Sequence, residues 1–153
     1  MFNIRTLRER FNGLSASPRA LFIASVAIIF LWLAATFLVL NEAQVDFISG
    51  LQLDKMVHFG GGIFVAGFFY FAYAISDRRR GIYIVLAVGI LWEIWELLFL
   101  PDQLSRFRHE FFWWLSDTAF DLVADILGAW FWVNLIRADS PRNTTSHRSA
   151  QCE

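Results

Sequence analysis

The sequence predicts an all-α protein of the membrane, a polytopic bundle of four transmembrane helices with a short interfacial helix between the third and the fourth. Hydrophobic residues make up 57% of the chain and the mean hydropathy is +0.48, which exceeds the apolar share of ordinary soluble domains. Residues 21–40 carry no charge and would be about 30 Å long as a helix, which is the thickness of a hydrocarbon core. The 153 residues suffice for one domain.

The composition also argues against several classes of function. Cys152 is the only cysteine, so the chain has no internal disulfide and no Cys/His spacing typical of a zinc site. The arginines flank apolar runs instead of lining a basic face, so the sequence gives no support for nucleic-acid binding.

Short charged segments separate the apolar runs and define the other elements. Three arginines at 78–80 follow the second run, and Pro101 ends the third. Residues 103–116 are too charged to cross a membrane and suit a helix in the interface, with Trp113 and Trp114 at the level of the headgroups. The expected division is a basic cytoplasmic segment at 1–20, a transmembrane domain at 21–137 with spans at about 21–40, 56–76, 82–100 and 117–136, and a disordered cytoplasmic tail at 138–153.

The basic residues are unevenly distributed between the two ends of the expected helices. Ten of the 13 lie in the N-terminal segment, in the turn at 78–80, or at the end of the last span and in the tail. By the positive-inside rule, both termini then lie in the cytoplasm, and the chain is a multi-pass protein of the bacterial inner membrane. The other two connections, with Lys55, Arg106 and Arg108, lie on the outer side.

A stripe of three carboxylates opens the fourth expected span. Asp117, Asp121 and Asp125 follow one another at intervals of four residues, so they share one face of a helix. Charged side chains are costly in hydrocarbon, and an ionisable residue inside a membrane is a functional candidate by default.

Two other spans carry ionisable residues to the same level. Glu93 and Glu96 share a face late in the third span, and His58 follows Asp54 by four residues at the start of the second. Counted from the outer ends of the spans, one set is about 6 Å deep and the other about 10 to 12 Å deep. The first set is His58, Glu96 and Asp121, and the second is Glu93 and Asp125. Three helices are therefore expected to bring these groups into one layer beneath the outer headgroups.

This acidic layer predicts a bound cation or protonated carboxyl groups. Six carboxylates in a poorly hydrated site repel one another strongly unless one of these two conditions holds. Oxygen ligands favour Mg²⁺, Ca²⁺ or Mn²⁺, and participation of His58 would allow Mn²⁺, Fe²⁺ or Zn²⁺. The expected metal ligands are Asp121, Asp125, Glu93 and Glu96.

An enzyme is the first functional hypothesis. A bound cation would polarise a phosphoryl or acyl oxygen of a lipid-linked envelope molecule, with His58 or Glu96 as general acid or base. Lys55 and Arg106 are the candidates for binding an anionic headgroup. The candidate catalytic residues are His58, Glu93, Glu96 and Asp121, and the supporting residues are Asp54, Asp117 and Gly128.

Each of these residues also has a structural explanation. A Lys55–Asp117 pair could fix the register of two helices, and a His58–Glu93 pair could do the same. Asp54 and Asp117 each precede an apolar run, which is the position of a helix N-cap. Arg106 fits an interface charge as well as a phosphate ligand. The glycines at 60–62 favour close helix packing over a phosphate cradle, because no strand precedes them.

Two further functions stay open. In a transport or ion-coupling protein the acids would relay a proton or a cation. A conduit also needs polar residues on the cytoplasmic half, where 64–75 and 85–91 offer almost only aromatic and aliphatic side chains. In a non-catalytic accessory subunit of a larger membrane complex, or a binding protein for lipid or a partner helix, the small residues of 62–66 and 124–128 would allow close packing.

The ionisable motifs together resemble those of a known family. They are Asp-Lys-x-x-His at Asp54–His58, Trp-Glu-x-x-Glu at Trp92–Glu96, and Asp-x-x-x-Asp-x-x-x-Asp-x-x-Gly at Asp117–Gly128. In this order, over about residues 50–136, they resemble VanZ-like membrane proteins, and even more the related YjdF-type inner-membrane proteins. The resemblance implies the helical membrane fold and the positions of the site. VanZ-like proteins are associated with teicoplanin resistance, and the family implies no established chemistry.

Overall fold

The structure, a computed structural model, describes residues 4–34, 53–99 and 101–139. Every regular element within these ranges is a helix, which confirms the predicted all-α class. The end of the first expected span, the connection after it and the tail from residue 140 onward lie outside the described residues. The helices are α1 (Ile4–Gly13), α2 (Ala16–Ala34), α4 (Leu53–Tyr73), α5 (Arg78–Phe99), α6 (Pro101–His109) and α7 (Phe111–Asp139).

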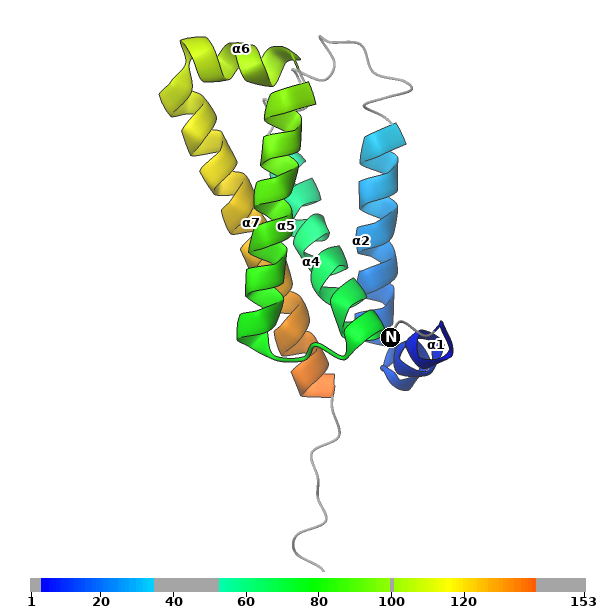
Figure 1. Cartoon of the computed structure of the whole chain (residues 1–153). Helices are drawn as coiled ribbons and strands as arrows, with labels where there is room; N and C mark the ends of the chain where they lie inside the picture. Colours follow the sequence, from blue (N-terminus) through cyan, green and yellow to red (C-terminus); the bar gives the residue numbers. More distant parts are fainter. Residues whose placement is uncertain (1–3, 35–52, 100, 140–153) are drawn as a thin grey trace, which may run out of the picture.

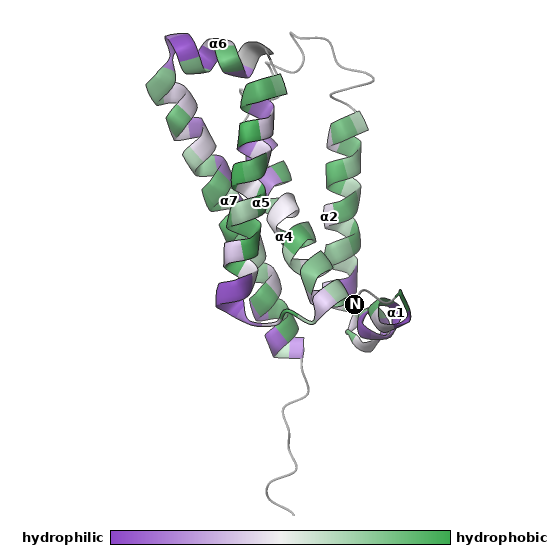
Figure 2. Ribbon diagram, in the orientation of Figure 1, coloured by the Kyte–Doolittle hydropathy of each residue, from purple (hydrophilic) through white to green (hydrophobic). Residues whose placement is uncertain are grey.

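Four of these helices are long and apolar enough to cross a membrane. They are α2, α4, α5 and α7, and they stand alongside one another, with α1 and α6 lying across opposite ends (Figure 1). Hydrophilic residues gather on α1, on α6, at the start of α5 and at the end of α7, while the middle of the bundle is mostly hydrophobic (Figure 2). The predicted four-span helical bundle is therefore confirmed for the described part of the chain.

The helix between the third and fourth spans is shorter than the expected segment 103–116. It ends at His109, and α7 begins at Phe111. The helical hydrogen-bonding pattern nevertheless continues through Glu110, whose backbone N–H donates to the Arg106 carbonyl at 2.7 Å and whose carbonyl accepts from Trp114 N–H at 3.0 Å. The chain therefore bends at one residue, and the aromatic segment after it becomes the first turns of α7.

Glycines set the distance between α4 and α7, which form the most extensive contact in the bundle. A Cβ atom added to Gly62 would collide with the backbone of Asp125. A Cβ atom added to Gly128 would collide with the backbone of Phe59. Only glycine allows two helix backbones to approach so closely, as expected for the glycines of the second span.

An aromatic and aliphatic core fills the end of the bundle near α1. Trp132 is completely buried there, with its ring centroid 5.8 Å from those of Phe22 and Phe71. Ile63 and Val85 are almost fully buried in the same core. This packing fixes the rotation of α4, α5 and α7 about their own axes. It therefore determines which side chains of these helices face one another at the α6 end of the bundle.

Polar contacts fasten the ends of the helices at the α1 end. Arg10 Nη1 donates to the carbonyl of Phe71, near the end of α4, at 2.8 Å. A cation at a helix C-terminus stabilises its unpaired carbonyls. The backbone N–H of Ser15, just before α2, donates to Asp139 Oδ2 at 2.9 Å. The first and last spans are thus joined at this end.

Candidate functional site

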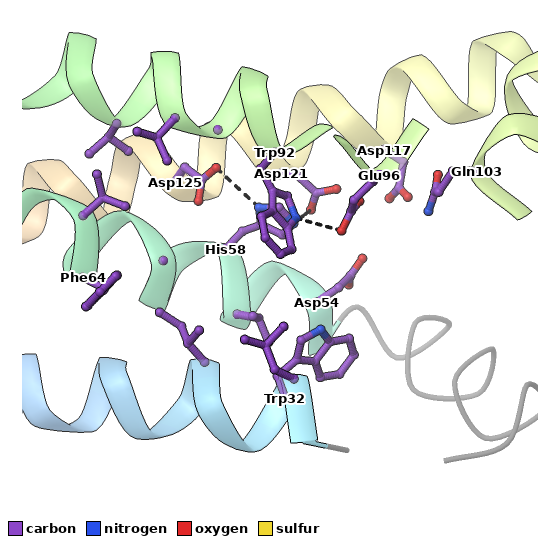
Figure 3. Close-up of a pocket in the computed structure, with 18 of the residues that line it drawn as sticks. Trp32, Asp54, His58, Phe64, Trp92, Glu96, Gln103, Asp117, Asp121 and Asp125 are labelled. Carbon is purple, nitrogen blue, oxygen red and sulfur yellow. Dashed lines mark hydrogen bonds and ion pairs between the residues drawn. The ribbon is translucent and has the colours of Figure 1, made fainter. Parts of the chain in front are cut away.

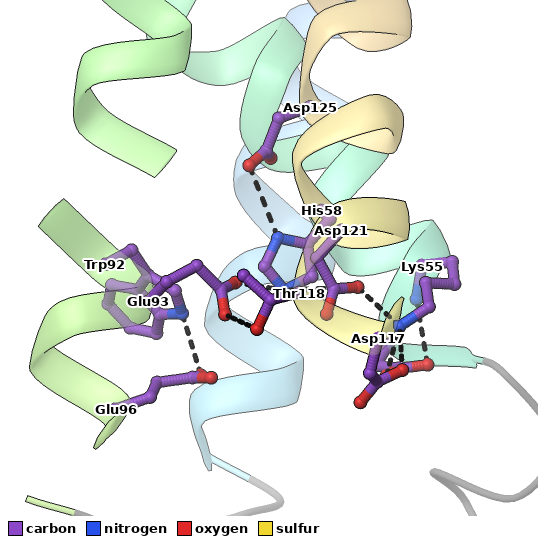
Figure 4. A network of polar contacts seen from close by, with 10 residues as sticks. Lys55, His58, Trp92, Glu93, Glu96, Asp117, Thr118, Asp121 and Asp125 are labelled. Carbon is purple, nitrogen blue, oxygen red and sulfur yellow. Dashed lines mark hydrogen bonds and ion pairs between the residues drawn. The ribbon is translucent and has the colours of Figure 1, made fainter. Parts of the chain in front are cut away.

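Three helices bring the predicted ionisable residues together at the α6 end of the bundle (Figure 4). Asp54, Lys55 and His58 come from the first turns of α4, which has Asp54 in its acidic first turn. Glu93 comes from the last turns of α5. The carboxylates of α7 lie on one face because they recur every four residues. The sequence-predicted layer is therefore a single cluster of side chains.

Lys55 is the cation of the outer part of this cluster. Its Nζ atom lies 2.6 Å from Asp117 Oδ1, 2.6 Å from Asp121 Oδ1 and 3.2 Å from Asp54 Oδ2. These three carboxylates are also close enough to one another to hold a metal ion. The ammonium group already supplies a positive charge among them, so this first group of acids is neutralised in part by the chain itself.

His58 lies at the centre of the inner part of the cluster. Its Nε2 atom is 3.7 Å from Asp121 Oδ1 and 4.0 Å from Glu93 Oε1. Its Nδ1 atom faces the opposite way and is 3.4 Å from Asp125 Oδ2. His58, Glu93 and Asp121 form a second group whose ligand atoms could hold a metal ion, and no lysine or arginine is paired with Glu93 among the described residues.

Two buried oxygens in this second group lack a hydrogen-bond donor. Glu93 and Asp121 are only 8% and 6% exposed, and Glu93 Oε1 and Asp121 Oδ1 accept no hydrogen bond within the described chain. Asp121 Oδ1 is nevertheless paired with the ammonium of Lys55 at 2.6 Å. Glu93 Oε1 is therefore the oxygen of the two that has no cationic side chain of the described residues beside it apart from His58. Buried carboxylate oxygens without a donor are costly, so the group is chemically incomplete as it stands.

Asp125 occupies a space made by glycines on two other helices. A Cβ atom on Gly89 would lie 2.7 Å from Asp125 Oδ2, and one on Gly61 would lie 3.4 Å from Asp125 Oδ1. Asp125 was predicted as a metal ligand, but the structure places it at the far nitrogen of His58, outside both metal-compatible groups. In this position it can fix the tautomer and the ring orientation of the histidine.

Thr118 belongs to the site although the sequence reasoning did not name it. Its Oγ1 hydroxyl donates to Glu93 Oε2 at 2.9 Å, which leaves the other oxygen of Glu93 directed to His58. The available signal was its spacing, because Thr118 precedes Asp121 by three residues and therefore shares its helix face.

Glu96 was predicted as a metal ligand and a catalytic group, and the structure places it beside the metal-compatible groups but in neither of them. Its Oε1 atom accepts a hydrogen bond of 2.8 Å from the indole Nε1 of Trp92, one turn earlier on α5.

Gly128, predicted as a supporting residue, packs against the backbone of α4 and does not contact the ionisable side chains through a side chain of its own.

A cavity of about 350 Å³ adjoins the cluster (Figure 3). His58, Asp121 and Glu96 line it, and Arg106 and Gln103 of α6 line it at the end nearest that helix. The opposite end is apolar. Its walls come from α2, α4 and α5, and they include Ile29, Leu33, Phe64, Val65, Val85 and Val88. The volume lies within the range of about 300 to 1,000 Å³ that is usual for ligand sites.

Both helix-register pairs considered from the sequence are present. Lys55 contacts Asp117, and His58 is within 4.0 Å of Glu93. Lys55 balances part of the charge of the first group, whereas Glu93 Oε1 in the second group accepts no hydrogen bond within the described chain. The described residues thus form a membrane-type bundle with a buried His/Asp/Glu group that could bind a metal ion.

Comparisons with protein families, with curated proteins and with solved structures give no match to this chain.

Proposed function

We propose that the protein binds a divalent cation through His58, Glu93 and Asp121 and uses it to act on a lipid-linked molecule of the cell envelope. The observation that carries the proposal is the buried oxygen Glu93 Oε1, which accepts no hydrogen bond within the described chain and lies with Asp121 Oδ1 on the Nε2 side of the His58 ring. A cation among these three side chains would balance the negative charge of Glu93, which Lys55 does not contact, and would share Asp121 with Lys55.

The donor set indicates the kind of metal. One imidazole nitrogen with two carboxylate oxygens suits Mn²⁺, Fe²⁺ or Zn²⁺ better than Ca²⁺, which takes oxygen ligands alone. Three protein ligands would leave a coordination position for water or substrate, as in catalytic metal sites. His58 and Asp121 line the cavity, so that open position would face it.

The remaining residues have roles that follow from their contacts. Asp125 would accept a hydrogen bond from Nδ1–H of His58 and so direct the Nε2 lone pair toward the metal, while Thr118 would orient Glu93. With both nitrogens of His58 engaged, Glu96 is the better candidate for general base, because it lines the cavity outside the ligand group. A cation bound here would polarise a phosphoryl or acyl oxygen and acidify a bound water.

The proposed location is the bacterial inner membrane, with the α1 end in the cytoplasm and the site beneath the outer headgroups. Arg10, Arg78–Arg80 and Arg137 lie at the α1 end, and the positive-inside rule assigns that end to the cytoplasm. Helix α6 would then lie in the outer interface. Membership of the VanZ-like proteins is proposed on the same motifs, since the ionisable residues that carry the resemblance meet at this site.

A non-catalytic accessory subunit is the second candidate function. The observation that favours it is Lys55, which forms ion pairs with three of the carboxylates, as in a purely structural network.

A transport pathway has less support, because the buried core toward α1 is apolar among the described residues apart from Ser25. The Ser25 hydroxyl donates a hydrogen bond to the Phe22 carbonyl.

Metal analysis of detergent-purified protein tests the proposal. We expect near-stoichiometric Mn, Fe or Zn in the wild type and its loss in Asp121→Asn and Glu93→Gln. Asp117→Asn is the matched control, because Asp117 is a carboxylate of the same helix that contacts Lys55 and not His58. The control should retain the metal.

One combination of results would reject the proposal. If the wild type binds no divalent metal after incubation with Mn²⁺, Fe²⁺ and Zn²⁺, and Asp121→Asn remains folded and supports the same cellular phenotype, then the cluster is structural. In that case the accessory-subunit function would replace the enzymatic one.

A further inference from the structure

The cavity beside the site has two chemically different ends. Its polar end holds His58, Asp121 and Glu96, with Arg106 contributed by α6. Its apolar end lies deeper in the bundle, between aliphatic and aromatic side chains of α2, α4 and α5. Along α4, the lining extends from Asp54 to Val65, a rise of about 16 Å for eleven residues of helix. The cavity therefore has room for more than an ion or a small polar headgroup.

The cavity is partly open on the side between α2 and α5. Val88 and Trp92 of α5 line it and are still 37% and 39% exposed. On the other side of the opening, Ile29 and Leu33 of α2 line it and are half-buried. Helix α2 packs chiefly on α4, and α5 chiefly on α7, so these two helices flank the opening without closing it. In a bilayer, such an opening faces hydrocarbon chains.

The charge at the polar end indicates the headgroup. Arg106 lines the cavity, and its guanidinium forms no hydrogen bond or ion pair with any other described residue. A guanidinium matches a phosphate in geometry as well as in charge. The neighbouring acids are balanced in part by Lys55 and, in the proposed function, by the cation at His58, Glu93 and Asp121.

We infer that the cavity binds an amphiphile made of a hydrocarbon chain and a phosphate-bearing head, which enters from the bilayer between α2 and α5. The chain lies against Ile29, Leu33, Val65 and Val88, and the phosphate lies between Arg106 and the metal group. The inference rests on the proposed function, because without the cation the carboxylates would repel a phosphate. It adds the class of the ligand, the seat of its chain and its route of entry.

Photo-crosslinking tests this inference. The probe is an alkyl phosphate with a photoreactive diazirine at the end of its chain, added to the purified protein in nanodiscs of zwitterionic lipid. We expect the labelled peptides to map to the cavity walls of α2, α4 and α5. An unlabelled alkyl phosphate should prevent this labelling, whereas an alkyl trimethylammonium of the same chain length and inorganic phosphate alone should not.

Matched variants separate the two ends of the cavity. Val88→Trp fills the apolar end and should abolish the labelling, while Val123→Trp, at an exposed valine of α7 outside the cavity, should leave it intact. Arg106→Gln should weaken binding about tenfold through loss of a charge-assisted hydrogen bond. Arg108→Gln, on the exposed side of the same helix, should have no effect.

Metal content measured in the same samples distinguishes the two proposals. Bound metal with labels spread evenly over all lipid-facing helices would overturn the inference and leave the proposed function standing. Cavity labelling in a protein that binds no metal would reject the proposed function and would overturn the placement of the phosphate against a metal group. Equal or better competition by the trimethylammonium compound or by inorganic phosphate would also overturn the inference.

Discussion

Asp121 is the residue at which the two acidic groups meet. Its Oδ1 atom is 2.6 Å from the ammonium of Lys55 and 3.7 Å from Nε2 of His58. A cation bound at His58, Glu93 and Asp121, as proposed above, would share this carboxylate with Lys55, whose charge is attached to the chain.

Replacement of Lys55 by Gln should show how much the ammonium group stabilises the three carboxylates around it. The change leaves Asp54, Asp117 and Asp121 without their cation, so the free energy of unfolding should fall by about 2 to 4 kcal/mol. Divalent metal should restore much of the loss by occupying the vacated position. Thermal unfolding in detergent, with EDTA and with added Mn²⁺, measures both effects, together with metal content.

Lys55→Arg is the control for this experiment, since it keeps the charge and should stay near the wild type. Equal stability of Lys55→Gln and wild type in EDTA would show that the ammonium contributes nothing to holding the three carboxylates.

At the scale of residues, the sequence indicated which residues belong to the site, but it did not indicate which of their atoms contact one another. The positions of the ionisable residues near helix ends were enough to predict that Asp54, His58, Glu93 and Asp121 share one layer. The sequence could not show that Asp125 faces the far nitrogen of His58 or that Thr118 holds Glu93. Those contacts depend on the rotation of each helix about its axis, and packing far from the site sets that rotation.

At the scale of elements, the contact between α4 and α7 is the one that aligns the site. Gly62 lies against the backbone of Asp125, so the glycine that permits the contact is adjacent to the carboxylate that faces His58. The sequence predicted close packing from the glycines at 60–62, but it could not tell which of the three makes the contact. Three consecutive residues of a helix point in three different directions, and only the position of the partner helix decides which of them makes the contact.

Gly62 and Gly60 should differ sharply when each is replaced by alanine. Gly62→Ala places a methyl group against the backbone of α7 and should destabilise the bundle by about 2 kcal/mol or more, because neither backbone can yield easily. Gly60→Ala is the matched control. Its added methyl group would meet only a side-chain atom of Ile28 at 3.8 Å, so stability should be unchanged or slightly higher. Thermal unfolding in detergent compares the two.

A result in which both alanine variants unfold together would contradict this account of the α4–α7 contact. In that case, the flexibility of the glycine-rich segment, and not the approach of α7, would explain the glycines.

At the scale of the whole molecule, the fold could be predicted because hydrocarbon imposes strict demands on a chain. Every backbone group must be paired inside the bilayer, so each long apolar run has to be a helix. This reasoning gave the all-α class and the four candidate spans, which are confirmed. It did not fix the helix ends, since α7 starts at Phe111 instead of about residue 117 and α2 already begins at Ala16. Helices can extend beyond the hydrocarbon, where composition no longer constrains them.

The orientation in the membrane is tested with the native cysteine. Cys152 is the only cysteine, and it should be protected from a membrane-impermeant maleimide in intact spheroplasts and labelled after the membrane is permeabilised. A Cys152→Ser variant that carries Ser105→Cys, at an exposed position of α6, should be labelled without permeabilisation. Equal access to both positions from the same side would reverse or abolish the proposed orientation.

The hydrogen bond between Ser15 and Asp139 has a consequence for biogenesis. The ribosome releases α2 long before it reaches Asp139, the acceptor that fastens the base of that helix. During translation, α2 therefore leaves the exit tunnel without one of its final partners, which is supplied only when the end of α7 has been synthesised. The two partners are 124 residues apart in the chain, so a nascent chain halted before Asp139 would lack this contact.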